Sequence, residues 1–247
     1  MTHTTVPVIF DLDGTLVDPA GGITGGIAAA LTELGLPVPG PARMNEMVGP
    51  KLSHALSDIA GVPASLVGDV IRIYRGHYKA TGIAQSRLYP GIRELLEGFV
   101  AAGRPIAVAT QKPEGIARTV LEHHGIAGLF HSIRGSATDE AGTGPEAAAA
   151  GKAGIVAAAL SDLAGVVPAT AARAVMVGDR AQDVAGAAAN GLGCIGVGWG
   201  FAPDGELQAA GAVEIVQDTA ALHTTITRLS ERPGTTALNE VHTDGNV

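Results

Sequence analysis

Two aspartates separated by one residue come directly after the first apolar run of the chain. Residues 6–10 read Val-Pro-Val-Ile-Phe, and Asp11, Leu12 and Asp13 follow. Side chains two positions apart on an extended backbone point to the same side, so both carboxylates can face one reacting atom. A buried strand that ends on such a pair indicates a chemical site, because carboxylates this close together need either a cation or a proton between them.

Further polar residues follow the other predicted strands. Thr110 ends "PIAVAT", with Lys112 two positions later, and Asp179 follows "AVMVG", with Asp183 four positions later. Lys152 opens a predicted helix between them. Ligands of parallel sheets bind beyond the carboxyl ends of the strands, so we expect these groups to meet at one edge. Hard oxygen ligands favour Mg²⁺, which would relieve the repulsion between the carboxylates.

The elements that must position these residues alternate between strands and helices, as in βαβ units. Runs of β-type residues predict strands over residues 6–10, 105–110, 132–134, 174–178, 194–197 and, as a sixth, 213–216. Apolar residues at helical spacing predict helices over residues 91–102, 113–124, 152–163 and 181–190. We therefore expect an α/β fold with a Rossmann-like, three-layer core around a parallel sheet.

Residues 18–87 interrupt this alternation with several helical stretches and no convincing strand. The segment is too long for an ordinary connection between a strand and a helix. We expect it to form a small α-helical cap domain, inserted into a core made of residues 1–17 and 88–231. The Ala- and Gly-rich residues 137–151 are expected to form a surface loop, and the polar residues 232–247 a disordered tail.

Composition limits the partners of the protein. The chain has 247 residues, a net charge of −8 and no Lys/Arg cluster, which disfavours a nucleic-acid polymer or an anionic membrane.

Cys194 is the single cysteine, so no disulfide can form within the chain, and we expect it in the core. The charge-free residues 184–203 contain too much glycine for a membrane span. The first ten residues lack a basic start and a long apolar run, so we do not expect them to act as a signal peptide. We expect a cytoplasmic protein, either a monomer or a homodimer.

Four stretches taken together resemble the motifs of the haloacid dehalogenase superfamily, whose members are mostly phosphatases. "DLDGT" matches its first motif, "VAT" the second, Lys152 the third and "GDRAQD" the fourth. The helical insertion resembles the C1 cap of that superfamily. "YPGIRELL", "VATQKPE" and "GVGWGF" are similar to its phosphoglycolate phosphatase and 5′-nucleotidase-like branch. One departure is the Ala/Gly loop, which places Lys152 further from the preceding strand than in that branch.

The resemblance implies a role for each residue of the aspartate pair. Asp11 would be the nucleophile that forms an aspartyl-phosphate. Asp13 would protonate the departing alkoxide and then activate the water that hydrolyses the intermediate. Gly14 permits the tight turn after the strand, and Thr15 is expected to orient Asp13. A second aspartate favours cleavage of a P–O bond, because a halide leaves without a proton.

The resemblance also implies a Mg²⁺ ion held by Asp11, the backbone carbonyl of Asp13 and Asp179, with Asp183 acting through water. Thr110 and Lys152 would offset charge on the transferring phosphoryl group. The expected substrate is a small phosphorylated metabolite. The residues expected to contact it, besides Gly14 and Thr15, are Gln111, Lys112 and the cap residues Asn45 and Lys51.

Other functions remain open at this point. A phosphotransferase or mutase of the same fold would pass the phosphoryl group to an organic acceptor. A non-catalytic sensor of a phosphorylated metabolite would be expected to lack the nucleophile or the acid, yet Asp11 and Asp13 are both present. A protein phosphatase would need an open site, which a cap of this length disfavours. Arg75 and Tyr78, in "YRGHY", are expected in the core or on the surface rather than at the substrate.

Overall fold

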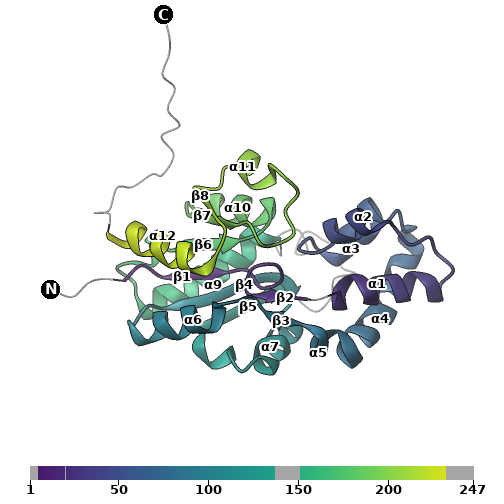
Figure 1. Cartoon of the computed structure of the whole chain (residues 1–247), viewed down its shortest axis with the longest axis horizontal. Coiled ribbons are helices and arrows are strands. Elements are labelled where there is room, and N and C mark those ends of the chain that lie inside the picture. The colour runs from purple at the N-terminus through teal and green to yellow at the C-terminus, as the bar shows by residue number, and fades with distance from the viewer. Residues whose placement is uncertain (1–4, 20, 137–150, 232–247) are drawn as a thin grey trace, which may run out of the picture.

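The computed structural model describes residues 5–19, 21–136 and 151–231 (Figure 1). Six parallel strands form its central sheet, in the order β5-β4-β1-β6-β7-β8. These strands are β1 (Val8–Phe10), β4 (Ile106–Pro113), β5 (Ser132–Ser136), β6 (Val175–Gly178), β7 (Gly193–Val197) and β8 (Glu214–Val216). Strand β1 lies between β4 and β6, so the three strands that carry the expected site residues are adjacent. The expected tail and all of the expected loop but Gly151 lie outside the described residues.

Helices cover both faces of the sheet. Alternate side chains of β1 belong to different clusters, with Val8 and Phe10 on one face and Ile9 on the other. The first face is covered by α6 (Ile92–Ala101), α7 (Glu114–His123) and α12 (Thr219–Glu231). The second is covered by α9 (Lys152–Val166), α10 (Ala181–Ala188) and α11 (Glu206–Ala210). This arrangement confirms the predicted three-layer α/β core.

The predicted strands and helices of the core are present, with shifted ends. Strand β4 continues to Pro113, past the expected end at Thr110, and helix α9 continues to Val166. Helices α11 and α12 were not predicted. The charge-free residues 184–203 are divided between the end of α10, strand β7 and the turn that follows it. Within the described ranges, no helix is long and apolar enough to cross a membrane.

A second sheet, not predicted from the sequence, marks the start and end of the helical insertion. It consists of β2 (Val17–Asp18) and β3 (Arg87–Leu88), which pair antiparallel. Residues 21–86, which we call the cap segment, lie between these strands and to one side of the main sheet (Figure 1). Their helices are α1 (Gly22–Glu33), α2 (Pro41–Glu46), α3 (Leu52–His54), α4 (Ala64–His77) and α5 (Ile83–Gln85), with π-helical turns at Ala55–Ile59 and Tyr78–Gly82. The cap segment is helical as predicted, and its status as a separate domain stays a prediction.

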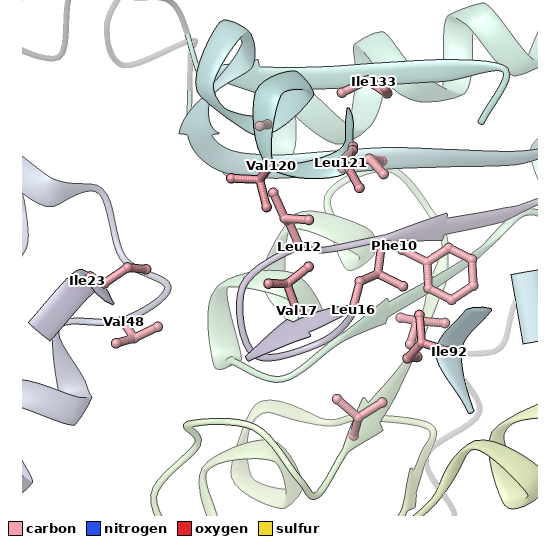
Figure 2. Packing of buried hydrophobic residues seen from close by; sticks show 14 of the residues in the cluster. Phe10, Leu12, Leu16, Val17, Ile23, Val48, Ile92, Val120, Leu121 and Ile133 are labelled. Atoms are coloured by element: carbon pink, nitrogen blue, oxygen red, sulfur yellow. The ribbon is translucent and has the colours of Figure 1, made fainter. Parts of the chain in front are cut away.

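Apolar packing fixes the turn that leaves β1. Leu12 and Leu16 are fully buried, and they lie beside Phe10 and Val17 in the cluster shown in Figure 2. Burying a side chain of this size contributes roughly 1.5–3 kcal/mol. The same cluster includes cap residues such as Ile23, so the turn that carries the two aspartates is held between the sheet and the cap segment.

Candidate active site

The turn after β1 places the two aspartates on one side of the chain. The backbone N–H of Asp11 donates to the carbonyl of Val177 at 2.9 Å, which continues the pairing of β1 with β6. Leu12, between the two aspartates, is fully buried in the apolar core that Figure 2 shows. Both aspartates are buried, with 4% and 7% of their surfaces exposed, and both line the same cavity. The period-two argument made from the sequence therefore describes the site.

Gly14 brings this turn against the end of β6. Its φ of +84° lies in the left-handed region, and a Cβ there would lie 2.1 Å from Oδ2 of Asp179. The hydroxyl of Thr15 donates to Oδ1 of Asp179 at 3.4 Å. Thr15 therefore contacts Asp179, whereas the sequence analysis had paired it with Asp13.

Three carboxylates gather where β1 and β6 end. Oxygen atoms of Asp11, Asp179 and Asp183 lie within 4.8 Å of one another, and all three side chains are buried. Asp179 accepts a hydrogen bond from the N–H of Phe201 at 2.8 Å, and Asp183 accepts one from the N–H of Arg180 at 3.0 Å. Burial, together with the charges of Asp183 and Asp11, raises the pKa of Asp179 well above its usual value. Three closely spaced carboxylates carry more negative charge than nearby cations neutralise, and their oxygen atoms suit a hard divalent cation such as Mg²⁺.

Lys152, the first residue of α9, supplies a buried positive charge to this cluster. Its Nζ lies 2.6 Å from Oδ1 of Asp11 and 2.5 Å from Oδ1 of Asp183. Burial alone would lower the pKa of Lys152, but the two carboxylates raise it above its usual value. Burial raises the pKa of Asp183 to about 6 although Lys152 opposes that shift. The structure thus places Lys152 at the site despite the long loop that precedes it.

Lys112 makes the corresponding pair with the second aspartate. Its Nζ lies 2.8 Å from Oδ2 of Asp13 and 4.4 Å from the ring centroid of Tyr78, in the cap segment. Oδ1 of Asp13 is buried and has no hydrogen-bond partner among the described residues. Burial raises the pKa of Asp13 although Lys112 opposes the shift. One oxygen of Asp13 is therefore paired with a buried ammonium group, and the other has no protein partner among the described residues.

Thr110 and Gln111 precede Lys112 directly in β4. The side chain of Thr110 is buried, and its hydroxyl oxygen accepts the N–H of Lys112 at 3.2 Å. That bond leaves the hydroxyl proton of Thr110 for another acceptor. Both residues line the cavity beside Asp11 and Asp13. Thr110 thus lies beside Asp11 and Asp13 as the second motif predicts, while a substrate contact of Gln111 stays a prediction.

A cavity of about 60 Å³ separates the sheet edge from the cap segment. Its core side is lined by Asp11, Asp13, Thr110, Gln111, Lys112, Pro113 and Ile116. Its cap side is lined by Ile23, Met47, Gly49, Pro50, Leu52, Tyr74, Arg75 and Tyr78. Neither Asn45 nor Lys51, the cap residues chosen from the sequence, is among these described lining residues. Asn45 is exposed, and Lys51 is half-buried between lining neighbours.

The sequence analysis missed the contribution to this cavity of the end of α4 and of the π-helical turn that follows it. Arg75, Tyr74 and Tyr78 all line it, although Arg75 and Tyr78 had been expected in the core or on the surface. Tyr78 is buried, as expected of a core residue, yet its hydroxyl has no hydrogen-bond partner among the described residues. The clustering of two tyrosines and an arginine in "IYRGHY" was the available signal.

The site combines the Asp11 and Asp13 pair, the buried Lys152 and a carboxylate cluster that fits a metal ion, on an α/β core with a helical cap segment. These features together are typical of one class of enzyme. The model of the haloacid dehalogenase-like hydrolase family matches residues 8–197. The chain belongs to this family, which confirms the resemblance seen in the four motifs. That match covers the three strands and the lysine that form the site.

Comparisons with individual proteins agree. The chain is 36% identical over 215 residues to a 5′-nucleotidase of Pseudomonas aeruginosa, covering 87% of this chain and 92% of that protein. It is 41% identical over 194 residues to the tyrosine-protein kinase PtkA of Mycobacterium tuberculosis, covering 78% of this chain and 62% of that protein. A crystal structure of a predicted phosphatase from Clostridium acetobutylicum superposes with a TM-score of 0.79 at 33% identity, covering 91% and 99% of the two chains. Other relatives are named phosphoglycolate phosphatase, so the expected class, phosphoric monoester hydrolase, is confirmed for the family to which the chain belongs.

Proposed function

We propose that the protein is a Mg²⁺-dependent phosphatase that hydrolyses small phosphomonoesters through an aspartyl-phosphate on Asp11. The observation that supports this best is the pair of ion pairs at one cavity, Asp11 with Lys152 and Asp13 with Lys112. Asp11 and Asp13 are paired with different buried lysines, so the two carboxylates can take different roles.

Asp11 is the proposed nucleophile. It lies at the end of β1, fixed by its backbone bond to Val177, and Lys152 contacts only one of its oxygens in the described residues. A carboxylate oxygen of Asp11 attacks phosphorus, and the bond from phosphorus to the ester oxygen breaks. The product of this step is the aspartyl-phosphate and an alcohol.

Asp13 is the proposed general acid and base. Asp13 lines the cavity, its Oδ1 has no hydrogen-bond partner among the described residues, and burial raises its pKa, which favours the protonated form. Asp13 gives its proton to the leaving ester oxygen and, once ionised, removes a proton from the water that attacks the aspartyl-phosphate. A positioned acid of this kind contributes about 10²–10⁴-fold to the rate.

The remaining residues stabilise charge. Thr110 can donate its hydroxyl proton, and Lys152 brings a positive charge to the phosphoryl oxygens beside Asp11. Asp11, Asp179 and the backbone carbonyl of Asp13 would hold Mg²⁺, and Asp183 would act through water. A bound Mg²⁺ would neutralise charge on the phosphoryl group and on these carboxylates.

The cap segment is proposed to select a small substrate. Its side of the cavity combines apolar residues with two tyrosines and Arg75, and the cavity is small. Lys51 and Asn45 stay proposals for contacts with a substrate larger than this cavity. Phosphoglycolate, nucleoside monophosphates and sugar phosphates are the candidates to compare.

The test is phosphate release from a panel of these esters, with Mg²⁺ and with EDTA. We expect turnover that needs Mg²⁺ and is lost in Asp11→Asn. Asp204→Asn is the matched control, because Asp204 is an exposed aspartate outside the cavity lining. A folded wild-type protein that releases no phosphate from any ester would contradict the proposal.

A second candidate, a phosphotransferase, is favoured by the 41% identity to a protein named tyrosine-protein kinase. Such an enzyme would pass the phosphoryl group of Asp11 to a hydroxyl acceptor instead of water. The distinguishing measurement follows a labelled phosphoryl group in the presence of alcohols and a tyrosine peptide. Label in free phosphate supports the phosphatase, and label on the acceptor supports the transferase.

A further inference from the structure

Arg180 connects the turn that carries the metal-type carboxylates to the cap segment. It follows Asp179 directly, and its backbone N–H donates to Asp183. Its side chain is buried. Nη1 donates to the carbonyl oxygen of Val48 and, at 3.3 Å, to that of Glu46. One side chain of the core therefore binds two backbone carbonyls of the cap.

Glu206, the first residue of α11, fixes the guanidinium in that position. Its Oε1 accepts from Nε of Arg180 at 2.9 Å, and its Oε2 accepts from Nη2 at 3.3 Å. Oε1 also accepts the N–H of Ala181 at 2.7 Å. A two-point pairing of this kind orients a planar guanidinium, which an ammonium group could not reproduce.

The cap chain is shaped to receive this side chain. Gly49 has a φ of +103°, and a Cβ at that position would lie 2.9 Å from Cγ of Arg180. Met47, Gly49 and Pro50 also line the reaction cavity. The residues that Arg180 holds are therefore the same stretch that forms one wall of the cavity.

We propose that Arg180 is a positioning residue that holds residues 46–50 of the cap segment over the cavity, and that Glu206 keeps its guanidinium in place. This inference rests on the proposed function, because it gives the cap wall a role in enclosing the substrate. Opening the cap breaks the bonds to Glu46 and Val48, while the pair with Glu206 remains within the core. Arg180 thus sets how much of the time the cavity is enclosed.

The experiment measures cap position directly. Spin labels on Ala42→Cys in α2 and Gln208→Cys in α11 report the distance between cap and core, since both positions are exposed. The native Cys194 is buried and does not compete for label. The distance distribution is compared for wild type, Arg180→Gln, Arg180→Lys and Glu206→Gln.

We expect Arg180→Gln to lower the short-distance population at least threefold. Arg180→Lys should resemble it, because the single nitrogen of an ammonium cannot make the two-point pairing with Glu206 and also reach the carbonyls that Nη1 binds. Glu206→Gln should fall between. Arg134→Gln is the matched control, since Arg134 pairs with both oxygens of Asp162 and does not line the cavity. The kinetic counterpart is a KM raised about tenfold in Arg180→Gln, with a smaller change in kcat.

A distance distribution in folded Arg180→Gln that matches wild type would overturn the inference, whatever the activity. If Arg180→Gln does not fold, the same comparison is made with Glu206→Gln, where an unchanged distribution and KM would overturn it. An absence of phosphatase activity in wild type would instead contradict the proposed function and leave the distance measurement to decide the role of Arg180.

Discussion

The ammonium group of Lys112 lies 2.8 Å from one carboxylate oxygen of Asp13, while the other oxygen has no partner among the described residues. The two residues come from β4 and from the turn after β1, and both line the cavity. The fixed oxygen sets the orientation of the carboxyl group, and the free oxygen is the one that can exchange a proton with a bound ester. The two carboxylate oxygens of Asp13 therefore have different roles.

Asp13→Asn should slow hydrolysis in proportion to how much the leaving group needs a proton. For an alkyl phosphate we expect a loss of about 10²–10⁴-fold in kcat. For p-nitrophenyl phosphate, whose phenolate leaves without protonation, the loss in the phosphorylation step should be much smaller. Single-turnover kinetics with the two esters check this. Equal losses for both esters would show that Asp13 does not act as the acid.

Lys152→Gln should affect both rate and stability. The change leaves Asp11 and Asp183 without their shared cation, and removing one partner of a buried ion pair costs about 3–5 kcal/mol. We expect a loss of about 10²–10³-fold in kcat, by analogy with loss of a transition-state donor. Urea unfolding and kcat are measured beside Lys79→Gln, an exposed lysine of the cap segment. A stability equal to wild type would contradict the buried pairing.

Gly14→Ala should be far more harmful than Gly21→Ala. Both glycines have a φ of +84°, so the backbone strain is matched, at roughly 1–2 kcal/mol for a residue with a Cβ. A Cβ at Gly14 would lie 2.1 Å from Asp179, whereas one at Gly21 meets nothing within 4 Å. Only Gly14→Ala should therefore weaken the Mg²⁺-induced rise in Tm. Equal effects of the two variants on that rise would argue against the close approach.

Asp179→Asn should make the metal-free protein more stable at neutral pH. The pKa of Asp179 is raised on folding, so at pH values between its ordinary and its folded pKa the folded state binds more protons than the unfolded state. Stability in EDTA is then lost as pH rises through that window, and the asparagine removes this loss. The Tm difference between variant and wild type should be near zero at pH 4 and should favour the variant by pH 7.

Mg²⁺ should reverse that order at pH 7, because a bound cation stabilises the ionised carboxylates of the wild type. Melting curves across pH 4–8, with EDTA and with Mg²⁺, provide the comparison. A Tm difference that does not change with pH would contradict the raised pKa, and one that does not change with Mg²⁺ would contradict the metal site.

Residues at strand ends could be placed from the sequence because local geometry determines them. Asp11 and Asp13 share a side through the period of an extended chain, and Asp179 reaches them because β6 pairs with β1. Lys152 was recoverable from its resemblance to the third motif and because the chain has only four lysines, of which Lys112 is the one other between Thr110 and Asp179. The three-layer core followed from alternating strand and helix patterns for the same reason.

Contacts between the cap segment and the core could not be predicted in this way. Lys112 contacts Tyr78, more than thirty residues away in the sequence, and Arg180 binds Val48, more than a hundred residues away. Such pairings depend on how the cap rests on the sheet, which no local periodicity encodes. Strands β2 and β3 have two residues each, too few for a recognisable alternation.

The most direct test of the account is whether phosphate becomes attached to Asp11. Enzyme mixed with a ³²P-labelled substrate and Mg²⁺ is quenched in acid within one turnover, digested, and analysed by mass spectrometry for the phosphorylated peptide. The account predicts label on Asp11 in wild type. With labelled p-nitrophenyl phosphate, whose phenolate leaves without protonation, it also predicts that label accumulates in Asp13→Asn, where hydrolysis of the intermediate is slowed. Turnover with no label on Asp11, or full turnover by Asp11→Asn, would contradict it.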